Sequence, residues 1–180
     1  MCALEALDQL SLDRVLLVPV HTPPHKEADA DPGVEVRVRL CEAAVAGEER
    51  LVVSRLEADV PGRSFTVDTL RGLHDRRPED DLTFIVGGDV AHSLPAWRGP
   101  EAILELAEIA VAEREELRRG EIAQAVSGLR GASGRMRFFD MPRLDISSSL
   151  IRGRVAAGRS IRYLVPDAVA ELISGEGLYL

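Results

Sequence analysis

The sequence predicts an α/β fold: a doubly wound, mostly parallel sheet of the Rossmann-like type, with a helical C-terminal part. Five short, almost continuously apolar runs are typical of strands that are covered on both faces. Helical patterns separate these runs, and such alternation indicates a parallel sheet with helices on both sides. Two further helical segments close the chain.

Local signals place each element. The expected strands are residues 14–20, 51–54, 82–87, 108–112 and 136–140, and the expected helices between and before them are residues 3–10, 34–46, 66–76, 100–106 and 118–129. A helix over residues 147–157 follows a serine run that can cap it, and Gly158 is placed to end it. A last helix over 166–174 has Pro166 at its first position and Gly175 just beyond its end.

Length, composition and charge restrict the class of protein. A chain of 180 residues with 46% hydrophobic and 29% charged residues is typical of one globular domain. Its net charge of -8 argues against broad binding of nucleic acid or anionic membrane, because both need a basic field. No apolar run reaches the ~18 residues of a membrane span and no signal peptide opens the chain, so we expect a cytoplasmic protein. Cys2 and Cys41 lack metal-ligand or redox spacing and are expected to be buried apolar residues.

The segments that follow the strands are where chemistry is expected, because doubly wound sheets bind ligands beyond the carboxyl ends of their strands. Residues 20–26 (VHTPPHK) carry His21, His25 and the only lysine, Lys26, on a loop stiffened by two prolines. Such a loop suits a phosphate or carboxylate, and a solvated turn explains it equally well. After the second strand, Ser64 or Thr66 can cap a helix whose N-terminus favours an anion, although a plain capped helix is the simpler interpretation.

Two glycines and an acid follow the third strand, in the order Gly87, Gly88, Asp89. The glycines permit a ligand to approach the backbone closely, and Asp89 can accept hydrogen bonds from ribose hydroxyls. Trp97, the only tryptophan, comes next in LPAWR. Its ring can stack on a planar ligand, or it can simply cover the core.

A serine cluster follows the fifth strand in DISSSLIR, residues 145–152. The hydroxyls of Ser147, Ser148 and Ser149 converge with backbone N–H groups at a helix start, and Arg152 lies one turn further in. Together they form a candidate phosphate cradle. A helix cap alone would explain one serine, but not three with a following arginine.

Taken in order, these motifs resemble those of bacterial nicotinate-nucleotide adenylyltransferases. VPVHTPPHK, SFTVDTL, FIVGGD with LPAW, ISSSLIR, SIRYLVP and a closing GLY run nearly end to end at family-like spacing. The resemblance implies a nucleotidyltransferase fold. It also implies an activity in NAD biosynthesis, the joining of ATP and nicotinate mononucleotide to give nicotinate adenine dinucleotide and pyrophosphate, with Mg²⁺ carried by ATP.

The resemblance also implies residue roles. Trp97 would stack on the pyridine ring, and the pocket for the nicotinate carboxylate would be shaped by Ser64, Phe65 and Thr66. The remaining substrate-binding residues line the nucleotide site or lie near the mononucleotide phosphate, and they are Gly88, Asp89, His25 and Lys26. The adenosine and phosphates of ATP would be held by Ile146, Ser147, Ser148, Ser149 and Arg152.

The sequence departs from the family at its start. The family opens with a strand and a Gly-rich turn that carries an H-x-G-H signature, whose histidines bind ATP phosphates; here residues 1–7 read as the helix after that turn. No catalytic residue is therefore assigned, and residues 1–180 are interpreted as one nucleotidyltransferase-like domain that is incomplete at its N-terminus. Because that strand is central, its absence would open both core and site. His21, His25 and His92 have the wrong spacing to substitute. The family's Arg-Pro-Gly turn is also altered, since Arg114 is followed by two acids.

Three hypotheses follow from this departure. The first is an enzyme of this family whose sequence starts late, and the second is a non-catalytic module that binds nucleotides. The third is an adenylyltransferase with another acceptor, such as pantetheine phosphate, against which SFTVDTL and LPAW argue. The sequence leaves open the preference for nicotinate over nicotinamide and the oligomeric state, a homo-oligomer included.

Overall fold

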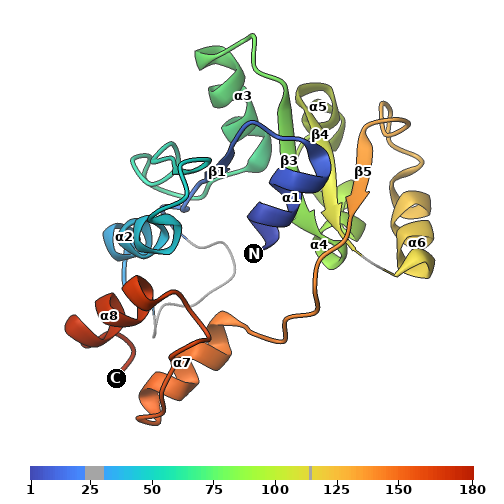
Figure 1. Cartoon of the computed structure of the whole chain (residues 1–180). Coiled ribbons are helices and arrows are strands. Elements are labelled where there is room, and N and C mark those ends of the chain that lie inside the picture. The colour runs from blue at the N-terminus through green and yellow to red at the C-terminus, as the bar shows by residue number, and fades with distance from the viewer. Residues whose placement is uncertain (23–30, 114) are drawn as a thin grey trace. The chain divides into compact units, whose positions relative to one another are not determined.

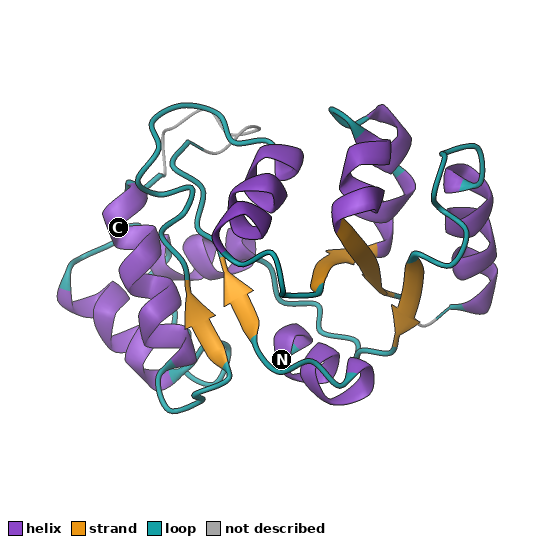
Figure 2. Ribbon diagram, turned by 90° about the horizontal axis from the view of Figure 1, so that it is seen from above, coloured by secondary structure: helices purple, strands orange, loops and turns teal. Residues whose placement is uncertain are grey.

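The computed structural model describes residues 1–22, 31–113 and 115–180 and confirms the predicted fold class (Figure 1). Strands and helices alternate along the chain, and every strand pair is parallel (Figure 2). All five predicted strands occur, and three of them end one to three residues earlier than expected, where the ladder pairing with the neighbouring strand stops. They are β1 (Val15–Leu17), β2 (Leu51–Val53), β3 (Leu82–Gly87), β4 (Ala107–Ala112) and β5 (Met136–Phe139).

The seven predicted helices also occur, with bounds that match the expected residues or differ from them by at most three. Two short helices that follow β3 were not predicted, because a helical period cannot be recognised over one turn. Gly158 follows its helix at φ +63°, as expected for a terminating glycine, whereas Pro166 occupies the N-cap of the last helix and Gly175 its last position. The helices are α1 (Cys2–Leu10), α2 (Val34–Val45), α3 (Thr66–Arg76), α4 (Gly88–His92), the 3-10 helix η1 (Leu94–Ala96), α5 (Pro100–Leu106), α6 (Glu116–Val126), α7 (Ser148–Ala156) and α8 (Asp167–Gly175).

The described part of the chain divides into two compact units, each with its own parallel sheet. Unit 1 comprises Met1–Asp13 and Phe65–Pro142 and holds the sheet β3-β4-β5. Unit 2 comprises Arg14–Ser64 and Arg143–Leu180 and holds the sheet β1-β2. That residues 1–180 form one domain, incomplete at its N-terminus, stays a prediction.

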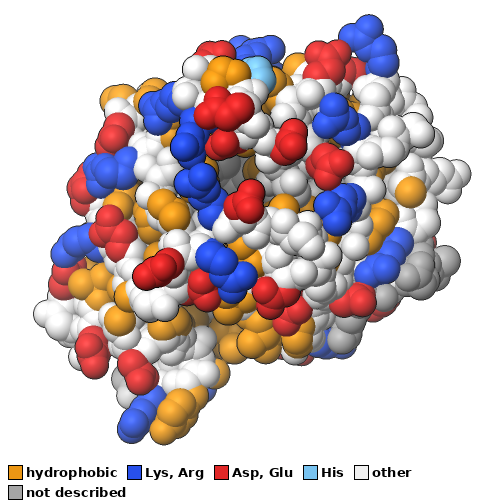
Figure 3. Space-filling view, turned by 45° about the horizontal axis from the view of Figure 1, so that its top comes forward, with side chains coloured by type: hydrophobic (Ala, Val, Ile, Leu, Met, Phe, Trp, Pro, Cys, Tyr) orange, Lys and Arg blue, Asp and Glu red, His pale blue; other side chains and the backbone are white. Residues whose placement is uncertain are grey.

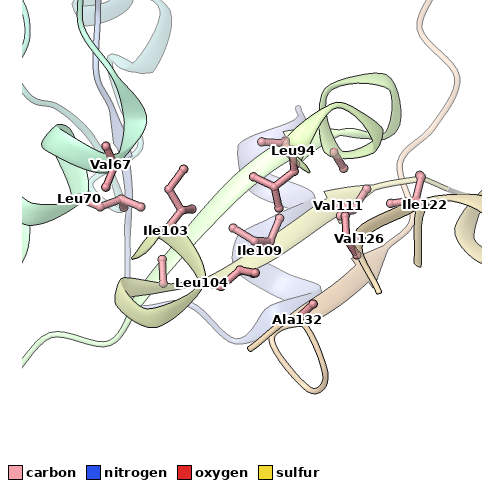
Figure 4. Close-up of a cluster of buried hydrophobic side chains, with 13 residues drawn as sticks. Val67, Leu70, Leu94, Ile103, Leu104, Ile109, Val111, Ile122, Val126 and Ala132 are labelled. Atoms are coloured by element: carbon pink, nitrogen blue, oxygen red, sulfur yellow. The ribbon is translucent and has the colours of Figure 1, made fainter. Parts of the chain in front are cut away.

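The sheet of unit 1 is covered on both faces, because side chains alternate between the faces of a strand. Ala110 of β4 points to the face on which α1 packs, where it meets Ala6, Leu10 and Phe139. Ile109 and Val111 point to the opposite face, where α3, α5 and α6 supply the larger cluster. Figure 4 shows this cluster, whose labelled members are Val67, Leu70, Leu94, Ile103, Leu104, Ile109, Val111, Ile122, Val126 and Ala132.

Unit 2 is built around its helices. A cluster of buried side chains from α7, α8 and the segment between them packs with partly buried residues of α2; its buried members are Ile151, Ile161, Val169 and Ile173. The expectation that every strand is covered on both faces is wrong for β1 and β2. Their register partners Leu16 and Val52 are 36% and 40% exposed, and burial alternates along both strands. Such alternation is typical of a sheet with one covered face.

Charges of both signs are interspersed on the face of the molecule drawn in Figure 3. None of the helices in the described ranges is long and apolar enough to cross a membrane.

Candidate functional site

Three acidic residues lie at the same edge of the sheet of unit 1. Asp89 follows β3 by two residues, Glu113 follows β4 directly, and Asp140 follows β5 directly. Gly87 is paired in register with Ala112, and Ala112 with Phe139, so the carboxyl ends of the three strands lie side by side. This is the edge at which doubly wound sheets bind ligands.

Glu113 is an almost buried carboxylate, with a side chain that is 9% exposed. Its Oε1 accepts a hydrogen bond from the backbone N–H of Glu115 at 3.1 Å. Its Oε2 would lie only 2.5 Å from a Cβ added to Gly88. A side chain at residue 88 would therefore force the Glu113 carboxylate to shift.

Two consecutive arginines in the first turn of α6 neutralise these acids. Arg118 hydrogen-bonds to Asp89 through Nη2, and its Nε lies 3.4 Å from Oε2 of Glu113. Arg119 donates to the backbone oxygen of Glu113 and to Oδ1 of Asp140, both at 2.6 Å. The hydrogen bond to Asp89 is the main cause that raises the pKa of Arg118 above its ordinary value. Sequence reasoning missed this pair, although two adjacent arginines at the start of a helix that follows a strand were visible.

Gln9 fastens α1 to the end of β5. Its side-chain amide donates to the backbone oxygen of Asp140 at 2.7 Å and accepts from the backbone N–H of the same residue at 2.9 Å. The backbone N–H and the backbone oxygen of Asp140 are thus both hydrogen-bonded to the Gln9 side chain. The first helix of the chain is therefore part of the support beneath this edge.

Trp97, predicted to stack on the pyridine ring, and Phe65, predicted to shape the pocket for the nicotinate carboxylate, also lie in unit 1. Trp97 is half-buried, meets the ring of Phe84 edge-on with centroids 6.1 Å apart, and donates from Nε1 to Oγ of Ser93 at 3.0 Å. Phe65 is 41% exposed, and the guanidinium carbon of Arg98 lies 4.6 Å from its ring centroid. Trp97 thus packs against the core, as the simpler interpretation held, and is only partly buried there.

The predicted cap of the helix that begins at Thr66 is wrong. Phe65 occupies the N-cap of α3, and no side chain there forms a capping hydrogen bond. Thr66 is already the first helical residue and Ser64 precedes the N-cap, so neither hydroxyl has the position from which a cap accepts the N–H groups of the first turn.

The serine cluster lies in unit 2, at the start of α7. Ser147 is the N-cap, and its Oγ accepts from the backbone N–H of Leu150 at 3.1 Å, which confirms the predicted cap. Arg152 donates through Nη2 to Oγ of Ser149 at 3.3 Å. Ser147, Ser148 and Ser149 are exposed, and Ile146 is 40% exposed. The hydroxyls, the helix start and the guanidinium therefore lie together, as a phosphate cradle requires.

A second arginine of unit 2, Arg37, holds the backbone of residues 20–21, which follow β1. Arg37 donates through Nη2 to the backbone oxygens of Val20 at 2.9 Å and His21 at 2.6 Å, and it pairs with Asp31. Tyr179 is near both arginines: burial raises the pKa of its hydroxyl, while Arg152 and Arg37 act to lower it. Sequence reasoning missed Arg37 and gave Tyr179 no role.

Three of the residues singled out from the sequence, His25, Lys26 and Arg114, lie outside the described residues. Cys2 and Cys41 are free and half-buried, and burial raises the pKa of both thiols. Within residues 1–22, 31–113 and 115–180, no group of three or more His, Cys, Asp or Glu side chains is arranged to hold a metal ion.

Parallel strands with flanking helices and polar groups at their carboxyl edge are typical of the doubly wound class of nucleotide-binding α/β proteins. The model of the family described as cytidylyltransferase-like matches residues 2–154. Solved structures agree on the fold. The nicotinic acid mononucleotide adenylyltransferase of Plasmodium falciparum, complexed with NaAD, has a TM-score of 0.75 at 16% identity and covers 99% of this chain and 90% of that chain.

Curated relatives are closer in sequence. The probable nicotinate-nucleotide adenylyltransferase of Citrifermentans bemidjiense is 40% identical over 191 residues, which span 98% of this chain and 88% of the relative. The protein of the same name from Shouchella clausii is 38% identical, with 98% and 86% covered. This chain therefore belongs to the cytidylyltransferase-like family and, within it, to the nicotinate-nucleotide adenylyltransferases. The resemblance seen in the sequence motifs is confirmed, whereas the roles of the individual site residues stay predictions.

Proposed function

We propose that this protein transfers the adenylyl group of ATP to nicotinate mononucleotide. The observation that carries the proposal is the 40% identity to a probable nicotinate-nucleotide adenylyltransferase over 98% of the chain. A phosphate oxygen of the mononucleotide attacks the α-phosphorus of ATP and a new P–O bond forms. The bond from that phosphorus to the oxygen bridging to the β-phosphate breaks, and pyrophosphate leaves. Such a reaction needs positioning and charge stabilisation, and no protein nucleophile.

Unit 1 supplies the site for the mononucleotide in this proposal. The accessible part of the Trp97 ring stacks on the pyridine ring, and its hydrogen bond to Ser93 together with its contact with Phe84 holds the indole in place. The nicotinate carboxylate is bound at the start of α3 by Phe65 and Thr66, together with Ser64, the last residue of unit 2 before them in the chain. Arg98, which lies over the Phe65 ring, brings a positive charge to the same aromatic group.

Unit 2 supplies the cradle for ATP in this proposal. The start of α7 presents backbone N–H groups and three serine hydroxyls, and Arg152 adds a guanidinium that is already hydrogen-bonded to Ser149. Helix N-termini and arginines both favour phosphate. Mg²⁺ would enter with ATP as part of the substrate and would supply positive charge to the leaving pyrophosphate. We place this reaction in the cytoplasm.

Calorimetric titration with ATP and with nicotinate mononucleotide, run beside a coupled assay of pyrophosphate release, tests the proposal. Binding of both ligands with release of pyrophosphate is the expected result. Binding without release would favour the alternative, a module that binds nucleotides without turnover. Failure to bind either ligand would refute both.

Variants of Trp97 test whether nicotinate mononucleotide is the acceptor substrate. Trp97→Ala should weaken binding of nicotinate mononucleotide by about tenfold, a typical cost of losing a stacked ring, while ATP binding stays within about twofold. Trp97→Phe keeps an aromatic ring and serves as the matched control. Equal losses for both ligands would refute the stacking role, and turnover with pantetheine phosphate in place of the mononucleotide would refute the acceptor.

A further inference from the structure

Asp89, Arg118 and Glu113 form a chain of contacts that runs from the surface of unit 1 into its interior. The side chain of Asp89 is 87% exposed, that of Arg118 is 43% exposed, and that of Glu113 is 9% exposed. Arg118 links the other two, since Nη2 donates to Asp89 and Nε faces Glu113 at 3.4 Å. Of these three residues, the family resemblance implies a role only for the outermost, Asp89, which would line the nucleotide site of the proposed enzyme.

The inner end of this chain is fixed in place. The backbone N–H of Glu113 donates to the backbone oxygen of Phe139 at 3.2 Å, and its own backbone oxygen accepts from Arg119 at 2.6 Å. Its carboxylate accepts from the N–H of Glu115 and lies against Gly88. Glu113 is therefore a rigid anchor, and Arg118, in the first turn of α6, extends from it toward the ligand edge of the sheet.

The outer end of the chain would otherwise be mobile. A largely exposed carboxylate samples several rotamers, and a ligand that binds it must then offset the entropy of ordering it. The hydrogen bond from Arg118 reaches only Oδ1 of Asp89, and a carboxylate offers about four acceptor positions. Arg118 can thus hold the side chain while Asp89 still accepts a hydrogen bond from a ligand hydroxyl.

We propose that Arg118 is a positioning residue of the nucleotide site, which orients the carboxylate of Asp89 and is itself oriented by Glu113. This inference rests on the proposed function, because it takes Asp89 to contact a nucleotide. Arg118 lies 29 residues from Asp89 in the chain and in none of the sequence motifs that carry the family resemblance.

A double-mutant cycle on the full chain tests this role, with binding of nicotinate adenine dinucleotide measured by calorimetry. The dinucleotide contains both nucleotide halves, so it probes the site whichever half Asp89 contacts. Arg118→Ala should weaken binding by about tenfold, within the range found for coupled neighbours, and Arg118→Lys should regain part of the loss because it keeps the charge. In an Asp89→Asn background, Arg118→Ala should cost less than about twofold, because the residue through which it acts has already been altered.

Arg130→Ala is the matched control, since Arg130 pairs with Glu105 at 3.2 Å on the exposed surface of the same unit. It should leave dinucleotide binding unchanged. Suppose that the unmodified protein binds the dinucleotide. If Arg118→Ala then binds it equally well, or if Arg118→Ala weakens binding as much in the Asp89→Asn background as in the unmodified protein, this inference is overturned and the proposed function stands. If the unmodified protein does not bind the dinucleotide, the proposed function fails and this inference fails with it. If Arg118→Ala does not fold, the same cycle is run with Arg118→Lys, for which full additivity with Asp89→Asn would be the contrary result.

Discussion

Gly88→Ala would place a methyl group into an occupied space. The added Cβ would lie 2.5 Å from Oε2 of Glu113 and 3.3 Å from Cδ1 of Ile122. Since carbon–oxygen contacts are ordinarily about 3.3 Å or longer, the carboxylate must retreat by roughly 0.8 Å. Its hydrogen bond from Glu115 and its contact with Arg118 resist that movement.

The expected cost follows from two opposing effects. Overpacking of a closely packed position costs about 1–3 kcal/mol, and replacing glycine returns about 0.4–1 kcal/mol by lowering the entropy of the unfolded chain. We expect Gly88→Ala to lower the free energy of unfolding by about 1–2 kcal/mol, and the midpoint of thermal unfolding by about 2–8 °C at this chain length. Far-UV circular dichroism during heating and during urea unfolding measures both quantities.

Two comparisons make this prediction specific. Gly120→Ala, inside α6 of the same unit, has no atom within 4 Å of the added Cβ, so it should raise stability by up to about 1 kcal/mol. In a Glu113→Ala background, Gly88→Ala should lose most of its cost, because the obstructing carboxylate is gone. An equal cost in both backgrounds, or no cost in the unmodified protein, would refute the steric reasoning.

Three further predictions concern the core, a cap and the thiols. Ile103 has no exposed surface, so Ile103→Ala should lower the free energy of unfolding by about 2–5 kcal/mol and Ile103→Val by only about 0.5–1.5 kcal/mol. Urea unfolding measures both values, and similar values for the two variants would contradict the packing described. Ser147→Ala should cost about 1 kcal/mol by removing the cap of α7, whereas Ser148→Ala should stay within about 0.5 kcal/mol, and equal effects would argue against the cap. Because burial raises the folded pKa of Cys2 and Cys41, their contribution to stability is fully present below about pH 8.5 and lost as pH rises through the raised values. Urea unfolding at several pH values should therefore show a weaker alkaline loss when both are changed to Ala, and an unchanged loss would contradict this.

Helices and strands were predictable where the signal is local. The bounds of α3 (Thr66–Arg76) and β3 (Leu82–Gly87) match the expected residues, because an amphipathic period or an apolar run is written into consecutive residues. The short helix α4 was missed for the converse reason, since five residues are too few to show a period. The expected cap at the start of α3 also failed, because a shift of one residue turns a capping position into a helical one.

The candidate site was predictable only in part. The cap at Ser147 involves a donor three residues away, so the local sequence contains both partners. The bonds from Arg118 to Asp89 and from Arg119 to Asp140 join residues 29 and 21 positions apart, and no pattern in the sequence pairs them. The same holds for Gln9 and Asp140, which are 131 positions apart.

By itself the sequence determined the class of fold, the family and the residue types offered at the ends of the strands, because motifs and periodicity depend on neighbouring residues. Only the tertiary structure decided which arginine pairs with which carboxylate. Parallel pairing of β3, β4 and β5 brings Asp89, Glu113 and Asp140 to one edge, and the packing of α6 sets the two arginines against them. Electrostatic contacts depend on separation in space, and that separation exists only once the sheet and helices have packed.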